Sequence, residues 1–595
     1  MLKTLAKRLG AAAVVLVVVS LLTFCALHVI PGDTATLILG TDATAESLQA
    51  LRASMGLDRS LPEQYLSWIG GVLMGDWGTS RTYSAPVWDV IASTLPVTIA
   101  LAVYATVLAL AVALVLGCAS ALRPGSAVDV VSRTLMQLAS AMPGFWLAVL
   151  CMLFFASYLG WFPVSGCVSL AKDPLGCIRS LTLPAVVLAC GELGVLIRTV
   201  RSSVMDALQQ EYMLATQVKG LTRARTVLTY VLRTSLSAPI TVAGIQMAKL
   251  VGGTAAVESV FALPGLGNLL LTAVEQRDIM LVQGIVVFVT LAVVVVNLAV
   301  DLLAMGVGAQ PNAARTTAGD LAQERRRGSR CLVAGLALVA VVVLAGVVSL
   351  FWTPCDPTAM DLSNRFALPS LEHPFGCDQF GRDILSRCMT AAVPALCVGV
   401  GSVVLGAVAG VAFGAFAAMG SRRLRAVCMR VTDALMSFPG VLLAMVLVLV
   451  LGRGLNSVLI AVAVFMVPVF ARLTCQITLD VAGGLYVKAA RVAGLNPLAI
   501  LVRHILPNTA PQLLTQLTAR IGSAMLLEAS LSFLGLGVQP PVVSWGYMLS
   551  EALPYVLSHP ALAVAPGIML MMAALGFNLV GDALNDRWLS KGGER

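Results

Sequence analysis

The sequence predicts an all-α membrane protein made of two homologous six-helix bundles, with about 12 transmembrane helices in total. Composition is the first observation: 58% of the 595 residues are hydrophobic, only 12% are charged, and the mean hydropathy is +0.91. This composition excludes a soluble globular protein. The second observation is a series of apolar runs of about 20 residues, each long enough to cross the hydrocarbon core. The third is that ordered motifs of the first half return in the second half.

The apolar runs locate the helices. The first run follows Lys3, Lys7 and Arg8 in the charge order of a signal peptide, but it is too long for an h-region and no small-residue cleavage site follows it. We therefore expect a retained first helix. The predicted spans lie near residues 10–30, 95–121, 135–156, 181–200, 237–255 and 280–304 in the first half, and near 331–352, 390–418, 431–451, 457–475, 510–530 and 561–583 in the second.

Basic residues predict the orientation of these helices. The clusters at 198–233 and 472–503 fall on the same side as the N-terminus, whereas the opposite side keeps only scattered basic residues. The positive-inside rule then places the clusters and both termini in the cytoplasm. The net charge of +9 follows from this topology and from contact with anionic membrane lipid. Nucleic-acid binding is not expected, because no basic groove with interleaved aromatic residues accompanies the charge.

Changes in composition divide the chain into parts. Residues 1–305 form the first half and residues 331–595 the second. Between them, residues 306–330 lose apolar character and gain Gly, Ala and Arg, which is typical of a cytoplasmic linker. Two longer polar segments lie outside the membrane in this topology, at residues 31–92 and 353–388, and we expect the first to be a small folded cap.

A repeated set of residues relates the two halves. Each set consists of an Arg, a Tyr fourteen residues later and a Gly eight residues after that: Arg198, Tyr212, Gly220 and then Arg472, Tyr486, Gly494. The match resumes downstream as ESVFALPGLG, which starts at Glu258, and EASLSFLGLG, which starts at Glu528. Two repeats of six helices have the same orientation in the membrane. This parallel duplication is typical of alternating-access transporters.

The polar loop of the second half, residues 485–511, predicts a helix–turn–helix at the cytoplasmic surface. Its first helix carries the small residues Ala489 and Ala490 and ends near Gly494, which permits a backbone reversal. A second amphipathic stretch then reaches Leu506-Pro507, where the proline stops or kinks the helix. Such an element can enter a groove of another protein and transmit a displacement.

This loop resembles the EAA loop of binding-protein-dependent ABC importers, which docks the cytoplasmic ATPase subunits. The pattern stands here as Lys488-Ala489-Ala490, Gly494 and Leu506-Pro507, with Lys in place of the usual Glu. The first half resembles a degenerate copy, in which Arg233 stands where the second half has Pro507. The residues that the resemblance assigns to coupling are Tyr212, Ala215, Lys219, Gly220 and Arg233 in the first half and Tyr486, Ala489, Ala490, Gly494, Leu506 and Pro507 in the second.

The resemblance extends over nearly the whole chain and narrows to the dipeptide/oligopeptide/nickel permease family. The first half resembles the B-type subunit through HVIPGDTA and GDWGTS, and the second resembles the C-type subunit through HPFGCDQFGRDILSR and SWGYML. The resemblance implies the type I ABC importer fold, a prokaryotic cytoplasmic membrane, two ATPase subunits below the membrane and a substrate-binding protein outside. Two subunits that are usually separate chains are fused here.

The chain carries no nucleotide-binding motif. It has no G-x-x-x-x-G-K-[ST] phosphate loop and no Gly-Lys dipeptide. We therefore expect a transport subunit and not an enzyme, with no cofactor of its own. ATP and Mg²⁺ belong to the partner ATPases.

Charged residues inside predicted helices are candidates for the translocation path. Lys249 and Arg520 occupy nearly equivalent places before the matched Glu258 and Glu528, and Glu192 lies mid-span. A charge deep in a membrane helix costs roughly 2.5–3.5 kcal/mol and usually faces a cavity. The alternative is that Lys249 and Arg520 snorkel or pair with one of the three glutamates. If they line the path, they favour a substrate carboxylate and repel a bare divalent cation, which favours peptides or a chelated metal over nickel alone.

The 13 cysteines do not predict a metal site, because their spacings match no zinc pattern and most sit singly in helices. Cys167 and Cys177 share one external loop, and Cys355 and Cys377 share another. An oxidising exterior would permit a disulfide in each loop. Free thiols are the alternative.

A secondary transporter is the rival class. Glu192 would then relay ions, and twelve helices in two parallel repeats would fit equally well. Such a carrier has no need for duplicated cytoplasmic loops, so the ABC importer explains more of the sequence. A membrane receptor is a third class, but no segment resembles a signalling domain.

Overall fold

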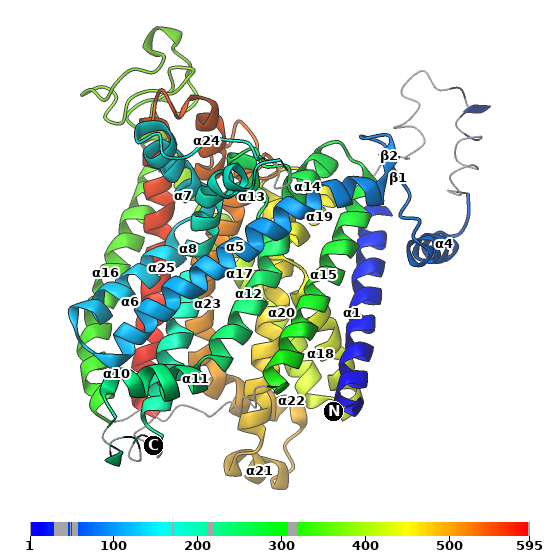
Figure 1. Cartoon of the computed structure of the whole chain (residues 1–595), viewed down its shortest axis with the longest axis vertical. Helices are drawn as coiled ribbons and strands as arrows, with labels where there is room; N and C mark the ends of the chain where they lie inside the picture. The colour runs from blue at the N-terminus through cyan, green and yellow to red at the C-terminus, as the bar shows by residue number, and fades with distance from the viewer. Residues whose placement is uncertain are drawn as a thin grey trace.

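The computed structural model describes residues 2–28, 58–168, 172–210, 221–306 and 318–592, together with positions 44, 46, 47, 49, 213, 216, 218 and 219. The all-α prediction is confirmed: long helices run side by side along the molecule (Figure 1). In this described part, the strands are confined to one antiparallel hairpin of β1 (Thr79–Ser80) and β2 (Ala85–Pro86).

The first half comprises α1 (Leu2–His28), α4 (Leu61–Met74), α5 (Val87–Leu122), α6 (Ala127–Ala141), α7 (Gly144–Cys151), η1 (Met152–Tyr158), α8 (Pro174–Leu208), α10 (Arg223–Thr226), η2 (Val227–Val231), α11 (Leu232–Ser235), α12 (Ser237–Gly253), α13 (Ala255–Val260), α14 (Leu266–Glu275) and α15 (Ile279–Gly306). The segments η1 and η2 are π-helical.

The second half comprises α16 (Ala318–Ser349), the 3₁₀ turn η3 (Leu362–Asn364), α17 (Ile384–Met419), α18 (Arg422–Ser437), α19 (Gly440–Leu451), α20 (Leu455–Ala482), α21 (Leu485–Val492), α22 (Pro497–Ile500), the π-helical η4 (Leu501–Ile505), α23 (Leu506–Phe533), α24 (Trp545–Ala552), the 3₁₀ turn η5 (Leu553–Tyr555) and α25 (Ala561–Gly592).

Seven of the described helices are long and apolar enough to cross a membrane, and two bent pairs raise the number to nine. The three other predicted spans are helical as α1, α12 and α23. Helix α1 has 27 residues, which is long enough for a crossing, whereas α12 has 17 residues and is short for one. Glu528 and Arg520 lower the hydropathy of α23.

The predicted spans at 135–156 and 431–451 each consist of two helices joined at a sharp bend. The first of these spans bends by 106° between α6 and the continuous run of α7 and η1, and the second bends by 91° between α18 and α19. Both bends fall at a residue followed by proline. Met142 and Phe438 have ψ of 124° and 130°, because a following proline disfavours the helical conformation. The helices restart at Gly144 and Gly440, so the Pro-Gly pairs mark corresponding helix starts in the two halves.

The two halves share one core. The helices with the most extensive contact are α5 and α8 in the first half, and α17 and α20 in the second. Across the boundary, α1 packs on α18 and α19, while α25 packs on α6 and α7. One apolar cluster therefore runs through both halves. Exchange of outer helices ties each half to the other.

The external segment 31–92 is folded where it is described. Tyr65 and Trp68 of α4 pack on Phe24 of α1, and the Tyr65 hydroxyl lies 2.8 Å from that of Ser20. The β-hairpin is held by Asp278, whose carboxylate accepts the Ser80 hydroxyl at 2.7 Å. Residues 31–43 and 50–57 lie outside the described residues.

The apolar span of α16 is Cys331–Ser349, which agrees with the span predicted near 331–352, but the helix itself is longer. Helix α16 begins at Ala318, ahead of the expected start near residue 331. Its first turns contain Ala, Leu, Gln, Glu and Arg, which are strong helix formers even where they are polar. Residues 307–317 lie outside the described residues.

Candidate coupling loops and translocation path

The second loop forms the predicted helix–turn–helix. Helix α21 ends before Gly494, whose φ of +80° is the left-handed conformation that permits the reversal. The Asn496 side chain then caps α22 by accepting the backbone N–H of Ala499 at 2.6 Å, and Pro497 occupies the first turn. Local chemistry at three successive points thus sets the shape of the loop.

One face of this loop is anchored to the bundle. Val487 and Ala490 of α21 are buried with Ile500, Leu501 and Ile505, and the same cluster includes Ala415 of α17. Displacement of α21 therefore acts on α17 through contacting side chains.

The opposite face of the loop is exposed and largely apolar. Leu485 and Val492 have exposed fractions of 82% and 90%, and Tyr486, Lys488 and Ala489 are exposed with them. Figure 1 shows α21 projecting beyond the other labelled helices at one end of the bundle. An exposed apolar face on a projecting helix is the form expected of an element that fits into a partner protein.

The helix does not end at Pro507. Leu506 is half-buried against the loop cluster, Pro507 is exposed in the first turn of α23, and the preceding turn is the π-helical η4. The first half has its π-helical turn η2 at the equivalent position, although Arg233 there replaces the proline. The π turn is therefore a property of the repeat and not of Pro507.

The first loop is described only in part. Tyr212, Ala215 and Gly220 lie outside the described residues. Lys219 is exposed, and Arg233 is exposed on α11. Helices α10 and α11 lie at the same end of the bundle as α21, and both chain ends are at that end (Figure 1). The two loops therefore share one face of the molecule, as the repeat predicts.

Lys249 lies on an open stripe of α12. Ile245, Lys249 and Gly253, spaced four residues apart, are exposed, whereas Ala248 and Leu250 are buried. The remaining sides of α12 pack on α5, α8, α15 and α19. A side chain added at Gly253 would meet no atom within 4 Å. Lys249 is thus the charged residue on the exposed side of a helix that is packed on its other sides, which is the position expected of a charge that faces a path through the membrane.

Glu192 and Lys249 are connected through one amide. Lys249 Nζ donates to Gln246 Oε1 at 2.8 Å, and Gln246 also hydrogen-bonds to Glu192 of α8. Glu192 is buried, and one of its oxygens has no hydrogen-bond partner among the described residues. Lys249 is therefore linked to Glu192 only through Gln246, and the described residues show no direct ion pair between Lys249 and a glutamate.

Arg520 differs from Lys249. It is half-buried on α23, and the described residues give it no ion pair. Its neighbour Ile521 packs on Gly399 of α17, and Ala519 packs on Gly581 of α25. The two cations therefore have different surroundings despite their similar places in the sequence.

Glu258 and Glu528 do not line an open surface, which differs from the expectation. Both are fully buried. Glu258 accepts the Thr98 and Thr254 hydroxyls at 3.0 and 2.7 Å and the Asn268 backbone N–H at 2.9 Å. The loop after α13 folds back over the carboxylate, and a Cβ at Gly265 would overlap it. Glu258 therefore joins α13, α14 and α5.

Glu528 has the corresponding place in the second half. It accepts the Ser532 hydroxyl at 2.7 Å, and Ser532 in turn accepts the backbone N–H of Val538 at 3.1 Å. A Cβ at Gly537 would overlap Ser532. The repeated E…GLG motif is thus a fold-back loop braced by a buried carboxylate.

The external segment of the second half contains a buried charge network that the sequence analysis missed. Arg387 donates to Asp378 at 2.5 Å and to Glu551 at 2.7 Å, and Arg382 contacts the same two carboxylates at 2.6 and 3.0 Å. The network joins the start of α17 to α24. The sequence feature that could have revealed this network is the high density of charged residues in DQFGRDILSR, which is unusual next to an apolar helix.

The cysteines are free thiols in this structure. The Cys167 and Cys177 thiols contact each other, and Cys355 lies close enough to Cys377 to interact electrostatically. Burial raises the pKa of the Cys377 thiol to about 11. Both disulfides stay predictions.

Comparison with known proteins defines the class. The family described as "Binding-protein-dependent transport system inner membrane component" matches residues 113–307 and again residues 410–590. The N-terminal domain of such membrane components matches residues 1–102. The chain therefore belongs to this family and carries its domain twice, in accordance with the internal repeat.

Individual relatives match half of the chain. A "Putative peptide transport system permease protein" of Brucella suis biovar 1 (strain 1330) is 37% identical over 297 residues, which is 50% of this chain and 95% of the relative. The glutathione transport system permease protein GsiD of Escherichia coli O1:K1 / APEC is 39% identical over 278 residues, which is 47% of this chain and 91% of the relative. A whole relative thus corresponds to one half of this chain.

Family and fold together identify the protein as a multi-pass inner-membrane permease of an ABC importer, of the dipeptide/oligopeptide type, with two permease units fused in one chain. The family consists of transport subunits. This family comprises components of binding-protein-dependent transport systems, which differ from the rival class of ion-driven secondary transporters.

Proposed function

We propose that this chain forms the translocation path for peptides or a related small solute, including a metal chelate, that an extracytoplasmic binding protein delivers. The observation that carries the proposal is the pair of related loops at one end of a fused permease, of which the better described one presents an exposed apolar helix face. The names of the relatives, which refer to peptide and glutathione transport, support this substrate class.

Two cytoplasmic ATPase subunits drive the cycle in this proposal. Each receives one loop: the first through Tyr212, Ala215, Lys219, Gly220 and Arg233, and the second through Tyr486, Ala489, Ala490, Gly494, Leu506 and Pro507. ATP and Mg²⁺ are bound by these partners, and the chain itself catalyses no reaction. Because Val487 and Ala490 contact the cluster that includes Ala415, movement of α21 displaces α17 and rocks the second half against the first.

The path runs along the open stripe of α12. Lys249 meets an anionic group of the substrate, such as the terminal carboxylate of a peptide, and Gln246 holds the ammonium group in place from the same helix. Arg520 contributes positive potential from the second half. A bare divalent cation would be repelled by both residues, so a metal would travel only in a chelate.

Orientation and domain division follow from charge. The basic clusters at 198–233 and 472–503 place the loop-bearing end in the cytoplasm together with both termini. The proposed units are residues 1–305 and 331–595, joined by a cytoplasmic connection within 306–330. The segments 31–92 and 353–388 then face the binding protein.

Reconstitution tests the proposal. The chain, its co-purified ATPases and its binding protein are placed in proteoliposomes and offered labelled peptides, nickel and a nickel chelate. Peptide uptake that requires ATP is the expected result. Uptake of the chelate alone would overturn the peptide assignment, and uptake that follows a proton gradient without ATP would overturn the mechanism.

A further inference from the structure

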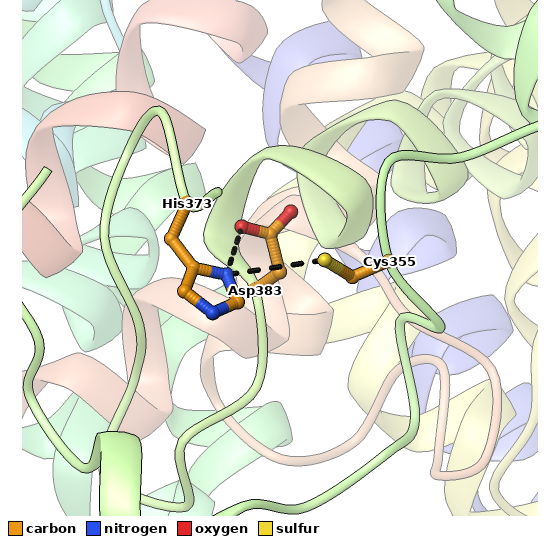
Figure 2. A group of neighbouring side chains, drawn as sticks. All are labelled: Cys355, His373 and Asp383. Atoms are coloured by element: carbon orange, nitrogen blue, oxygen red, sulfur yellow. Dashed lines mark hydrogen bonds and ion pairs between the residues drawn. The ribbon is translucent and has the colours of Figure 1, made fainter. Parts of the chain in front are cut away.

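A cysteine, a histidine and an aspartate converge in the external segment of the second half. Figure 2 shows His373 between Cys355 and Asp383, with both neighbours directed at the same ring nitrogen. His373 Nδ1 lies 3.1 Å from Asp383 Oδ1 and 3.9 Å from Cys355 Sγ, and the three potential ligand atoms all lie within 4.8 Å of one another. Their separations in sequence are 18 and 10 residues, so only the fold brings them together.

The geometry excludes a catalytic relay. In a Cys-His-Asp triad the acid binds one ring nitrogen and the thiol binds the other, so that a proton passes through the ring. Here both contacts are made to Nδ1 (Figure 2). Thiol, imidazole and carboxylate thus point to one place, as the ligands of a metal ion do.

A second layer of hydrogen bonds holds two of the three groups. The Ser386 hydroxyl accepts the backbone N–H of Cys355 at 3.0 Å and donates to Asp383 Oδ2 at 2.7 Å. This leaves Asp383 Oδ1 available on the side of the histidine. Outer partners that orient the ligands are characteristic of metal centres and contribute strongly to affinity.

Local contacts also fix the backbone around the cluster. Ser370 fixes His373, since its hydroxyl accepts the His373 N–H at 3.0 Å. Gly376 has a φ of +77° and turns the chain toward Asp383, whose N-cap position begins α17. The Asp383 side chain is fully buried and that of His373 is 16% exposed, so a small ion could enter past the imidazole.

We propose that Cys355, His373 and Asp383 form a binding site for Zn²⁺ on the external face of the permease. Zinc takes thiolate, imidazole and carboxylate together, and three protein ligands leave a fourth position for water. On binding, the Cys355 thiol loses its proton and the imidazole proton resides on Nε2, which frees the Nδ1 electron pair.

The site would join the chain after α16 to the first turn of α17. This segment lies at the end of the bundle opposite α21 (Figure 1). Zinc there would brace the external segment 353–388 without contact with the coupling loop. It would be a resident ion that stabilises this segment, distinct from any transported metal.

Metal titration of the purified full chain tests this inference. Chain stripped of metal is titrated with Zn²⁺ against a chromophoric chelator, and Co²⁺ is substituted to record a thiolate charge-transfer band. We expect one Zn²⁺ per chain and a cobalt band that disappears in Cys355→Ser. Because loss of an outer partner alone typically weakens affinity by about 10–100-fold, Cys355→Ser should weaken it by at least about 100-fold and Ser386→Ala by about 10-fold.

Cys377→Ser is the matched control, because it removes the neighbouring buried thiol and should leave zinc affinity within about threefold, less than the loss of an outer partner. It also separates zinc binding from the Cys355–Cys377 disulfide. Absence of stoichiometric zinc, equal binding by Cys355→Ser, or protection of both thiols from alkylation until a reductant is added would overturn the site. The cobalt spectrum of the unaltered chain decides the question even if a variant fails to fold.

Discussion

Trp146 of α7 donates its indole N–H to the carbonyl oxygen of Ala563 in α25, at 2.9 Å, across the boundary between the two halves. Phe145 stacks on Phe533 beside it, with ring centroids 4.7 Å apart. Both aromatic residues follow the Pro143 bend, so the bend of the first half delivers its side chains into the core of the second. The halves are thus joined where α6 and α7 change direction.

Gly567 makes this contact possible, because a Cβ there would overlap the Trp146 indole. We expect Gly567→Ala to destabilise the purified chain, by about 1–3 kcal/mol if the indole must shift within a packed core. Thermal unfolding in detergent measures the effect. Gly191→Ala on α8 is the control, since a Cβ there meets no atom within 4 Å and should stabilise the helix slightly. Equal behaviour of the two variants would show that the indole does not depend on this glycine.

Gly494 has a φ of +80° at the turn of the coupling loop, with open space around it. We expect Gly494→Val to redirect α21, because a β-branched residue disfavours this conformation by about 1–2 kcal/mol. ATPase subunits should co-purify poorly and ATP-driven uptake should fall. Gly75→Val, at the external end of α4 with a φ of +94°, imposes the same strain away from the loops. If Gly75→Val lost the ATPases equally, general instability would be the cause and the docking assignment would fail.

The sequence predicts helix identity and loop shape well, because both depend on local chemistry. Gly494 and Asn496 define their turns within a few residues. The Pro-Gly pairs at Pro143 and Pro439 are visible in the sequence, but hydropathy stays continuous across them, so the sequence does not reveal how sharply the two spans bend. Burial of Glu258 was not predictable, because it arises only when the loop after α13 folds back over the carboxylate.

The cluster of Cys355, His373 and Asp383 shows the same limit. Its ligand spacings match no short motif, and the turns at Gly376 and Gly381 create the proximity. Pattern matching for metal sites depends on ligands close in sequence, so it does not detect sites that a folded external segment assembles.

Lys249 predicts a preference for substrates with a free carboxylate. We expect Lys249→Met to raise the KM for a peptide with a free C-terminus by about 10-fold or more, since a hydrogen bond to a charged group contributes about 1.5–3 kcal/mol. Lys249→Arg should retain most of the affinity, because the positive charge stays. The same peptide with an amidated C-terminus is the matched substrate control. Equal uptake of the two peptides by the unaltered protein would contradict contact between Lys249 and the carboxylate.

Arg387 holds together the external end of the second half. Its side chain is 3% exposed and binds Asp378 and Glu551, so Arg387→Met would leave one buried and one half-buried carboxylate short of a partner. Breaking a buried ion pair on one side typically costs about 3–5 kcal/mol, although Arg382 still contacts both acids and should reduce the loss. We expect a lower unfolding temperature and faster proteolysis of the segment 353–388. Arg365→Met is the control: Arg365 is exposed and stacks on Phe366, a contact of about 0.5–1 kcal/mol. If both variants unfolded at the same temperature, the network would be dispensable. The joining of α17 to α24 would then have to come from other contacts, such as those of the buried Trp545, whose indole N–H donates to the Cys388 carbonyl oxygen at 2.9 Å.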